Sequence, residues 1–314
     1  MMVWIVAGIL AFLLVAVLVI TYICFRMAFY VPTRKPAPED FIDIPEGEEY
    51  EPYHEDMERW ARETKAMPHE AVSITSSDGL TLRGKYYEYA PDAPIELMVH
   101  GYRGNAERDL CGGVQRCFTL GYSALIVNQR ASADSDGHVI TFGVREYRDV
   151  LAWVSFMLDR FGKDVKIILT GISMGAATVM MTADQPLPPN VKGILADCGF
   201  TSPKAIICKV IRQMGLPVAL AYPFVRLGGL LYGGFDIESR AAVEVLKNSR
   251  VPVLFFHGEA DGYVPCDMSR ENYDACSSRK RLVTVADADH GLAYICDPDG
   301  YRQAVREFFD ESCT

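Results

Sequence analysis

The chain has 314 residues, of which 50% are hydrophobic and 23% are charged. This length and composition fit one large globular domain with attached segments. The formal net charge of −10 comes without a basic stripe that could neutralise phosphates, which excludes nucleic acid as a partner class. The nine cysteines are an odd number without Cys-x-x-Cys spacing, so they favour a reducing compartment and argue against a metal site.

Residues 3–25 form an uninterrupted apolar run without a charged residue. A helix of this length can cross the roughly 30 Å hydrocarbon layer, so we expect a single transmembrane anchor. A cleaved signal peptide is the alternative, but the N-terminal flank lacks Lys and Arg, and no small-x-small cleavage site follows cleanly. Arg26, Arg34 and Lys35 follow the run, which favours a cytoplasmic position for the rest of the chain, with the opposite side as the alternative.

Residues 26–52 are rich in proline and acidic residues, a composition typical of a linker. We expect this linker to hold a domain of residues 53–314 away from the bilayer. Residues 53–67 have the apolar spacing of an amphipathic helix, which would pack on that domain.

A hairpin is predicted next, because residues 71–75 and 80–87 are strand-like and flank the turn sequence Ser76-Ser77-Asp78-Gly79. Strand-like and helical patterns then alternate, with a clear helix over residues 144–161. The strand-like segments are 95–100, 123–128, 165–170, 191–196, 251–257 and 281–286. This order predicts an α/β fold with a mainly parallel central sheet flanked by helices on both faces.

The sequence Gly171-Ile172-Ser173-Met174-Gly175 stands between a strand-like run and a stretch of small, helix-compatible residues. Strand, sharp turn and helix in this order predict a nucleophile elbow centred on Ser173. Glycines at both ends allow the strand and helix backbones to pass close to each other. A serine at a helix N-terminus also lies near N–H groups that can stabilise a developing negative charge.

About fifty residues separate the strands at 191–196 and 251–257, more than one crossover helix needs. Residues 201–236 within this stretch are apolar and rich in glycine. We expect a small helical lid over Ser173, and a patch that touches the membrane is the alternative.

A serine becomes nucleophilic when an imidazole accepts its proton and a carboxylate orients that imidazole. Of the six histidines, only His257 and His290 follow Ser173. His290 comes just after the last strand, where a loop can bring it over the sheet, so we predict it as the base. His257 ends the preceding strand and is expected to bond to its loop. Asp261 in that loop is the predicted acid, ahead of Glu259, Asp287 and Asp289.

An oxyanion hole needs two donors, one of which is the backbone N–H after the nucleophile, here Met174. The second is expected from Tyr102, in the turn His100-Gly101-Tyr102-Arg103-Gly104-Asn105 that follows a strand. His100 itself is expected to be structural, because it precedes the nucleophile and would duplicate His290.

These motifs, in this order, resemble the α/β-hydrolase superfamily over residues 71–309. Within it the chain is similar to serine-aminopeptidase-like and monoacylglycerol-lipase-like hydrolases, particularly bacterial forms tethered by one N-terminal helix. The resemblance implies an α/β-hydrolase fold and cofactor-free hydrolysis of esters, thioesters or amides. One loop departs from it: residues 128–137 keep Arg130 and Ser135 of Asp-x-Arg-Gly-His-Gly-x-Ser but lack its histidine, which puts substrate contacts there in doubt.

The leading hypothesis is a membrane-anchored serine hydrolase that cleaves a carboxylic ester of a small or lipid-like substrate through an acyl-enzyme. An aminopeptidase-like amide hydrolase or a protein thioesterase is the alternative. A non-catalytic binding protein on the same fold is the hypothesis from another class. We expect neither a cofactor nor a metal, and the sequence leaves the oligomeric state open.

Overall fold

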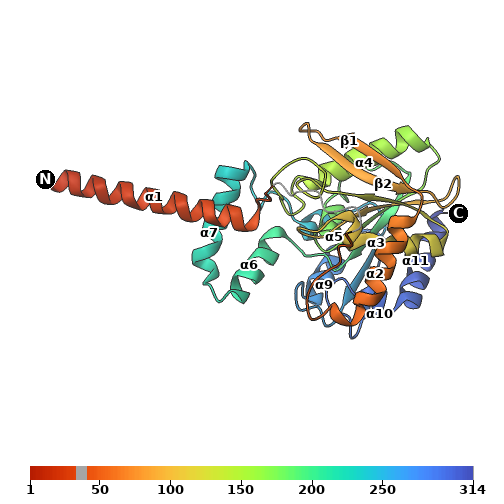
Figure 1. Ribbon diagram of the computed structural model, residues 1–314. Coiled ribbons are helices and arrows are strands. Elements are labelled where there is room, and N and C mark those ends of the chain that lie inside the picture. Colours follow the sequence, from red (N-terminus) through yellow and green to blue (C-terminus); the bar gives the residue numbers. More distant parts are fainter. Residues whose placement is uncertain (33–40, 314) are drawn as a thin grey trace.

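The computed structural model describes residues 1–32 and 41–313. Helix α1 (Met2–Ala28) projects from a domain that is built on one eight-stranded sheet (Figure 1). The chain ends on the side of the domain opposite the free end of α1. By length and composition, α1 is a candidate membrane span.

The sheet has the strand order β1-β2-β4-β3-β5-β6-β7-β8. Strand β2 pairs antiparallel with β1 and β4, and all other neighbours are parallel. The predicted hairpin and parallel sheet are therefore confirmed. The strands are β1 (Glu70–Thr75), β2 (Thr81–Tyr87), β3 (Ile95–Val99), β4 (Ser123–Val127), β5 (Ile167–Ile172), β6 (Val191–Asp197), β7 (Val253–Gly258) and β8 (Lys280–Val285).

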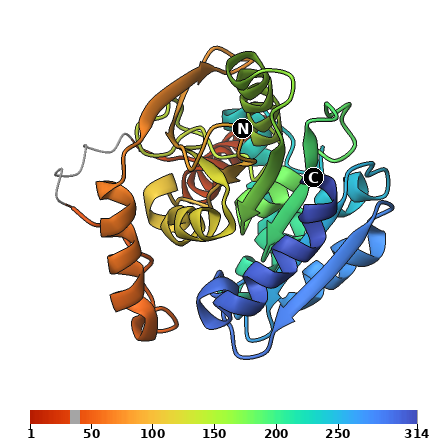
Figure 2. The same cartoon turned by 90° about the vertical axis from the view of Figure 1, so that its right-hand side faces the viewer.

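Helices cover both faces of the sheet (Figure 2). Because side chains alternate along a strand, successive residues of β3 belong to different cores: Leu97 packs on the side of α4 and α5, and Met98 packs on the side of α3 and α11. The helices are α2 (His54–Ala66), α3 (Ala106–Leu120), α4 (Glu146–Phe161), α5 (Met174–Met180), α6 (Pro203–Gln213), α7 (Val218–Gly228), α8 (Ala242–Leu246), α9 (Cys266–Ala275), α10 (Ala293–Cys296) and α11 (Pro298–Cys313), with a 3₁₀ turn at Glu51–Tyr53 and a π-helix at Gly229–Gly233.

Helix α2 is the amphipathic helix expected over residues 53–67. Met57 and Ala61 are buried, and the helix packs against α3. Charged residues on its outer side pair with each other, as Arg59 does with Asp56 at 2.6 Å. The prediction of a helix that packs on the domain is confirmed.

The junction between α1 and the domain differs from the expected linker. Phe25, Phe29 and Val31 are buried in the core, and Phe29 is fully inaccessible. The backbone joins the domain as well, since Ile140 N–H donates to Phe29 O at 2.9 Å and Val31 N–H donates to His138 O at 2.8 Å. The expectation of a stand-off linker is therefore wrong for residues 26–32, because burying large aromatic side chains outweighs the freedom of a linker. Residues 33–40 of the predicted linker lie outside the described part of the chain.

The segment 201–236 is helical, as expected, and α7 within it crosses α1 and packs against it (Figure 1). Gly228 allows this close approach, because a Cβ at that position would lie 2.8 Å from Thr21 O. The π-helix continues the contact, with the Tyr232 hydroxyl donating to Leu18 O at 3.0 Å.

Candidate active site

Ser173 occupies the sharp turn between β5 and α5 with φ 56° and ψ −118°. This positive φ is a strained conformation for a residue with a side chain. The flanking glycines have steric reasons: a Cβ at Gly171 would lie 2.3 Å from the Gly175 carbonyl, and one at Gly175 would lie 2.0 Å from Val99 O. The elbow geometry predicted from the sequence is therefore present.

Two hydrogen bonds connect Ser173 to His290 and His290 to Asp261. His290 Nε2 is 2.9 Å from Ser173 Oγ, and His290 Nδ1 is 2.7 Å from Asp261 Oδ2. Since Asp261 only accepts, Nδ1 carries the proton and Nε2 can accept the proton of the serine hydroxyl. The three residues come from the ends of β5, β7 and β8, which parallel strands bring to the same edge of the sheet.

The carboxylate of Asp261 is held in its ionised form by four donors. Its Oδ1 accepts from the backbone N–H groups of Tyr263 and Val264 at 2.8 and 2.7 Å. Its Oδ2 accepts from His257 Nε2 at 3.1 Å as well as from His290. Burial on its own would raise the pKa of Asp261, but the hydrogen bonds from His257 and His290 outweigh burial and lower that pKa below its usual value.

His257 is fully buried and braces the loop that carries Asp261, as expected for this residue. Its Nε2 also donates to Val264 O at 2.8 Å, while its Nδ1 lies 2.6 Å from Ser269 Oγ. Of the other acids considered, Asp289 accepts from the backbone N–H groups of Gly262 and His290, which ties the two loops together. Glu259 pairs with Arg270 at the surface.

Of the two predicted oxyanion donors, Met174 directly follows Ser173, and Tyr102 belongs to a turn beside it. Met174 is the first residue of α5, so its N–H has no acceptor within the helix. The turn that carries Tyr102 lies against the serine, because a Cβ at Gly101 would be 3.5 Å from Ser173 Cβ. Gly101 N–H donates to Asp109 Oδ2 at 2.9 Å, which fixes the turn.

Tyr102 also joins the turn to the end of α1. Its hydroxyl donates to Ala28 O at 2.8 Å, and its ring stacks on Phe142 with 4.8 Å between the centroids. Arg103 donates to Met27 O at 2.8 Å. These donors satisfy carbonyl groups that the last turn of a helix leaves unpaired.

His100 is structural, as expected. It is buried, its Nε2 accepts from Gln129 N–H at 3.0 Å, and its carbonyl accepts from the Gln129 side chain at 2.7 Å. Burial lowers the pKa of His100, so this imidazole stays neutral. It anchors the loop after β4 to the turn that carries Tyr102.

A cavity of about 570 Å³ borders Ser173 and His290. One wall comes from the segment predicted as a linker, since residues 43–46 line the cavity together with Glu49 and Tyr50. The Tyr50 hydroxyl donates to His290 O at 3.0 Å, and Asn105 Nδ2 donates to Asp43 Oδ2 at 2.6 Å. Sequence reasoning missed this wall, although Ile44 and Tyr50 stand out as apolar residues in an acidic stretch.

The expected lid over Ser173 is not formed by residues 201–236. None of the described residues of that segment lines the cavity. The segment reaches the site only at the acid loop, where Lys209 donates to the carbonyl groups of Gly262 and Tyr263. The physical reason is that α7 buries its apolar surface against α1, which was predicted as a separate anchor.

The loop 128–137, which departs from the expected motif, has a structural role here. Buried Arg130 forms a bidentate pair with Asp149 at 2.7 Å and also contacts Asp78 at 2.8 Å. Ser135 Oγ accepts from Arg83 N–H and donates to Asn128 O. Within the described part of the chain, no residue of this loop lines the cavity.

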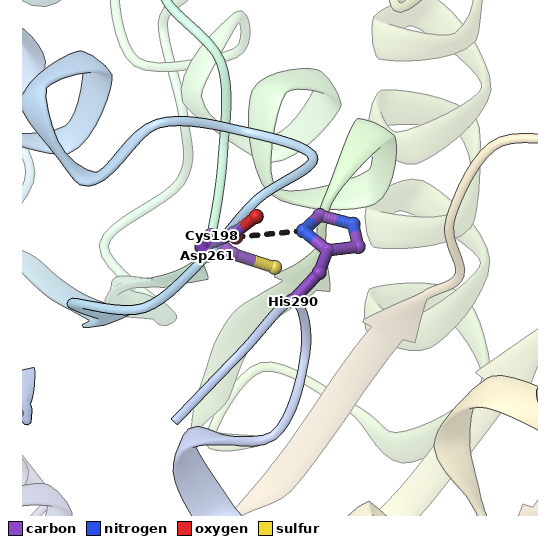
Figure 3. A group of neighbouring side chains, drawn as sticks. All are labelled: Cys198, Asp261 and His290. Carbon is purple, nitrogen blue, oxygen red and sulfur yellow. Dashed lines mark hydrogen bonds and ion pairs between the residues drawn. The ribbon is translucent and has the colours of Figure 1, made fainter. Parts of the chain in front are cut away.

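Cys198 lies beneath the acid and the histidine (Figure 3), and the potential ligand atoms of Cys198, Asp261 and His290 are within 4.8 Å of one another. Burial raises the pKa of the Cys198 thiol well above its usual value, which disfavours the thiolate that a metal needs. Both ring nitrogens of His290 already face partners, Asp261 and Ser173. This chemistry fits a proton relay better than a metal site.

Comparisons with known proteins agree with this fold. The sequence model of the alpha/beta hydrolase fold family matches residues 97–226. The Bacillus subtilis protein YqkD is 26% identical over 301 residues, which cover 95% of this chain and 94% of YqkD.

Two solved structures share the architecture. The esterase Pf2001 of Pyrococcus furiosus superposes with a TM-score of 0.63 at 22% identity, covering 87% of this chain and 98% of the esterase. Est1E of Butyrivibrio proteoclasticus, solved with ferulic acid bound, gives a TM-score of 0.58 at 21% identity, covering 77% of this chain and 98% of Est1E. With its eight-stranded sheet, its elbow and these similarities, the chain has the α/β-hydrolase fold.

Proposed function

We propose that this protein is a serine hydrolase that cleaves carboxylic esters with Ser173 as the nucleophile. The observation that carries the proposal is the sequence of hydrogen bonds from Ser173 through His290 to Asp261, at 2.9 and 2.7 Å, beside a cavity large enough for a small substrate. The strained φ of Ser173 and the lowered pKa of Asp261 support the same assignment.

In the first half of the reaction, Ser173 Oγ attacks the acyl carbonyl carbon while its proton passes to His290 Nε2. Asp261 stabilises the imidazolium that forms, because its carboxylate accepts from Nδ1. The carbonyl oxygen becomes an oxyanion, which the N–H groups of Met174 and Tyr102 stabilise. His290 then gives its proton to the leaving alcohol as the bond from the acyl carbon to the alcohol oxygen breaks.

In the second half, water replaces the alcohol. His290 accepts one proton of the water, whose oxygen attacks the acyl carbon of the Ser173 ester. The same oxyanion donors stabilise the second intermediate, and His290 returns the proton to Ser173 Oγ as the acid is released. The relay therefore ends in the state in which it began.

Covalent labelling with a fluorophosphonate probe, which reacts with an activated serine, tests Ser173 as the nucleophile directly. We expect the full-length chain to be labelled covalently and the Ser173→Ala variant to remain unlabelled. Ser155→Ala is the matched control, because Ser155 lies exposed on α4 and, among the described residues, bonds only to Leu151 O in its own helix. Labelling of Ser173→Ala at the wild-type level would refute the assignment, and a chain that neither reacts nor turns over any ester would support a binding protein on this fold.

Substrate class is tested with three matched acyl donors, namely an alkyl ester, an aminoacyl amide and an acyl thioester. We expect the ester to be hydrolysed with the highest kcat/KM, in line with the esterase among the similar structures. A higher value for the amide would assign an aminopeptidase-like activity, and a higher value for the thioester would assign a thioesterase. The full-length chain is required, because Met27 and Ala28 bond to the turn beside Ser173 and residues 43–46, Glu49 and Tyr50 line the cavity.

We also propose that α1 is a retained membrane anchor. Cleavage of the apolar run as a signal peptide would remove Phe25 from the core and uncover the faces of Phe29 and Tyr232 that pack on it. Such a loss of buried aromatic area costs several kcal/mol, on the order of 3–5 for one large side chain. The N-terminal sequence of the protein purified from membranes tests this proposal, because a start at Arg26 or beyond would refute it.

The depth of α1 in the bilayer brings a second surface to the membrane. The Tyr232 hydroxyl bonds to Leu18 O, and residues 2–17 on the N-terminal side of this contact span about 24 Å at 1.5 Å per residue. A bilayer needs about 30 Å, so the membrane must reach the level of α7 and the π-helix. Exposed apolar side chains gather there, and we call them the apolar rim: Met214, Leu216, Leu220, Leu230, Leu231 and Tyr232.

The apolar rim therefore supports the membrane-contacting alternative for residues 201–236. Arg26, at the domain end of α1, supports a cytoplasmic position of the domain by the positive-inside rule. Protease treatment of intact cells that express the protein, stripped of any wall, tests the orientation, since a cytoplasmic domain stays intact and an external one is degraded.

A further inference from the structure

The cavity beside Ser173 has a polar floor that the proposed reaction does not use. We define the polar floor as four residues that line the cavity and are each at most 6% exposed: Arg116, Thr170, Asp197 and Tyr301. They come from α3, β5, the end of β6 and α11. Glu96 on β3 lies directly behind them, fully buried.

Part of the hydrogen-bonding capacity of this group is used internally. Arg116 Nη2 and the Thr170 hydroxyl, the latter at 2.8 Å, both donate to Glu96 Oε2. The Tyr301 hydroxyl donates to Asp197 Oδ2 at 3.0 Å. The ring of Tyr301 is itself fixed by stacking on Phe256, with 3.6 Å between the centroids.

Three polar atoms of this group have no hydrogen-bond partner within the described part of the chain. Glu96 Oε1, Arg116 Nε and Asp197 Oδ1 are buried and have no hydrogen-bond partner among the described residues. Buried polar atoms without partners cost folding free energy, so three of them in one group point to a ligand or water that completes them. Because Arg116 and Asp197 line the same cavity as Ser173, a molecule held at the serine can reach them.

The chemistry of the free atoms selects the ligand. Among the residues that line the cavity, the free carboxylate oxygen of Asp197 needs a donor, and the free N–H of Arg116 needs an acceptor. A hydroxyl group offers both, and a protonated amine offers donors. The two arginines that line the cavity are each paired with a carboxylate, Arg116 with Glu96 and Arg108 with Asp109. An anionic end group would therefore meet no uncompensated positive charge there, and a methyl group would leave Asp197 Oδ1 and Arg116 Nε unpaired.

Resting on the proposed function, we infer that the polar floor is a binding subsite for a hydroxyl or amino group at the far end of the substrate. The subsite extends along β5 from Ile172, which pairs with Asp197, back to Thr170. Thr170 and Ser173 are three residues apart, which is about 10 Å along a strand. The substrate is then an ester whose acyl or alcohol part carries a polar terminus at that distance, rather than a plain hydrocarbon chain.

Binding is measured first on the full-length Ser173→Ala variant in detergent micelles, so that turnover does not enter. The ligands are four methyl esters of equal chain length, ending in methyl, hydroxyl, amino or carboxylate. We expect the hydroxyl and amino esters to bind about tenfold more tightly than the methyl-ended ester, which corresponds to about 1.4 kcal/mol, and the carboxylate ester to bind most weakly. Tighter binding of the amino than of the hydroxyl ester would assign the preference to charge, and equal binding would assign it to hydrogen bonding.

Two variants locate the preference. In Asp197→Asn one acceptor becomes a donor, which a protonated amine cannot use, so the ratio of affinities for the amino and methyl esters should fall toward one. Tyr87→Phe is the matched control, because the Tyr87 hydroxyl is also buried and unpartnered in the described chain but does not line the cavity. It should leave the ratio unchanged.

Equal or tighter binding of the methyl-ended ester to Ser173→Ala would overturn the inference, since the polar floor would then hold only water. This comparison needs no second variant to fold. The failure of the proposed function has a different signature, namely that the wild-type chain turns over none of the four esters whatever their relative affinities.

Discussion

The attachment of Tyr102 to α1 makes a specific prediction about catalysis. The Tyr102 hydroxyl donates to Ala28 O at 2.8 Å, and its backbone N–H is a proposed oxyanion donor. Tyr102→Phe removes this hydrogen bond but keeps the ring stacked on Phe142. The turn beside Ser173 then loses one of the contacts that hold it against the end of α1.

The size of the effect follows from the contact. A buried hydrogen bond of this kind contributes about 0.5–1.5 kcal/mol, and leaving Ala28 O unpaired adds to the cost. A loss of about 1–2 kcal/mol changes the population of the productive turn by a factor of about 5–30. This is smaller than the factor of about 100–1,000 in kcat for removal of an oxyanion donor. Because the donor acts on the transition state, KM should change little.

The assay is the steady-state hydrolysis of a soluble ester by the full-length chain in detergent, with kcat and KM determined separately. Tyr232→Phe is the matched control, since it removes another tyrosine hydroxyl from an α1 carbonyl, that of Leu18, without touching the turn. We expect kcat to fall about 5–30-fold in Tyr102→Phe and to stay unchanged in the control. An unchanged kcat in Tyr102→Phe, or an equal fall in Tyr232→Phe, would refute this reasoning.

Three further outcomes are expected. Gly175→Ala should destabilise the fold by more than about 3 kcal/mol, because its Cβ would lie 2.0 Å from Val99 O, and a thermal unfolding midpoint near the wild-type value would contradict this. A hydrogen bond from Arg130, opposed in part by burial, holds the pKa of Asp78 at about 2, below its unfolded value. This contribution to stability is therefore present above about pH 4 and lost as the pH falls toward 2. Because Asp78 is 46% exposed, Asp78→Asn should cost only about 1 kcal/mol at pH 7, with a difference from wild type that shrinks below pH 4 in denaturant titrations. An environment-sensitive dye on Leu220→Cys should report an apolar surrounding in nanodiscs, whereas a water-like signal would argue against membrane contact of the apolar rim.

Much of the local chemistry could be predicted from residue patterns. The elbow was predictable because a strand, a serine turn with glycines and a helix have a short-range steric logic, which the close approaches at Gly171 and Gly175 display. Asp261 and His290 were predictable because parallel strands end at one edge of the sheet, so loops after consecutive strands converge there. The structure brings these residues together, while their catalytic roles stay predictions that labelling and kinetics can test.

Other parts of the site could not be predicted, because they depend on contacts between distant segments. Tyr50 reaches His290 across 240 positions of the chain, and no local pattern in an acidic, proline-rich stretch encodes that contact. The apolar residues of 201–236 indicated a surface that another segment buries. Only the packed structure shows that this surface lies against α1 and not over the cavity.

By itself, the sequence determined the alternation of strands and helices, the nucleophile elbow and the order of the site residues, because hydrophobic periodicity and turn chemistry act over a few residues. Tertiary structure alone decided that α1 docks on the turn of Tyr102, that residues 43–50 form a wall of the cavity, and that unpaired polar groups line its floor. The physical reason is that burial and hydrogen bonding between distant segments are properties of the packed chain, in which each surface is covered by whichever segment can reach it.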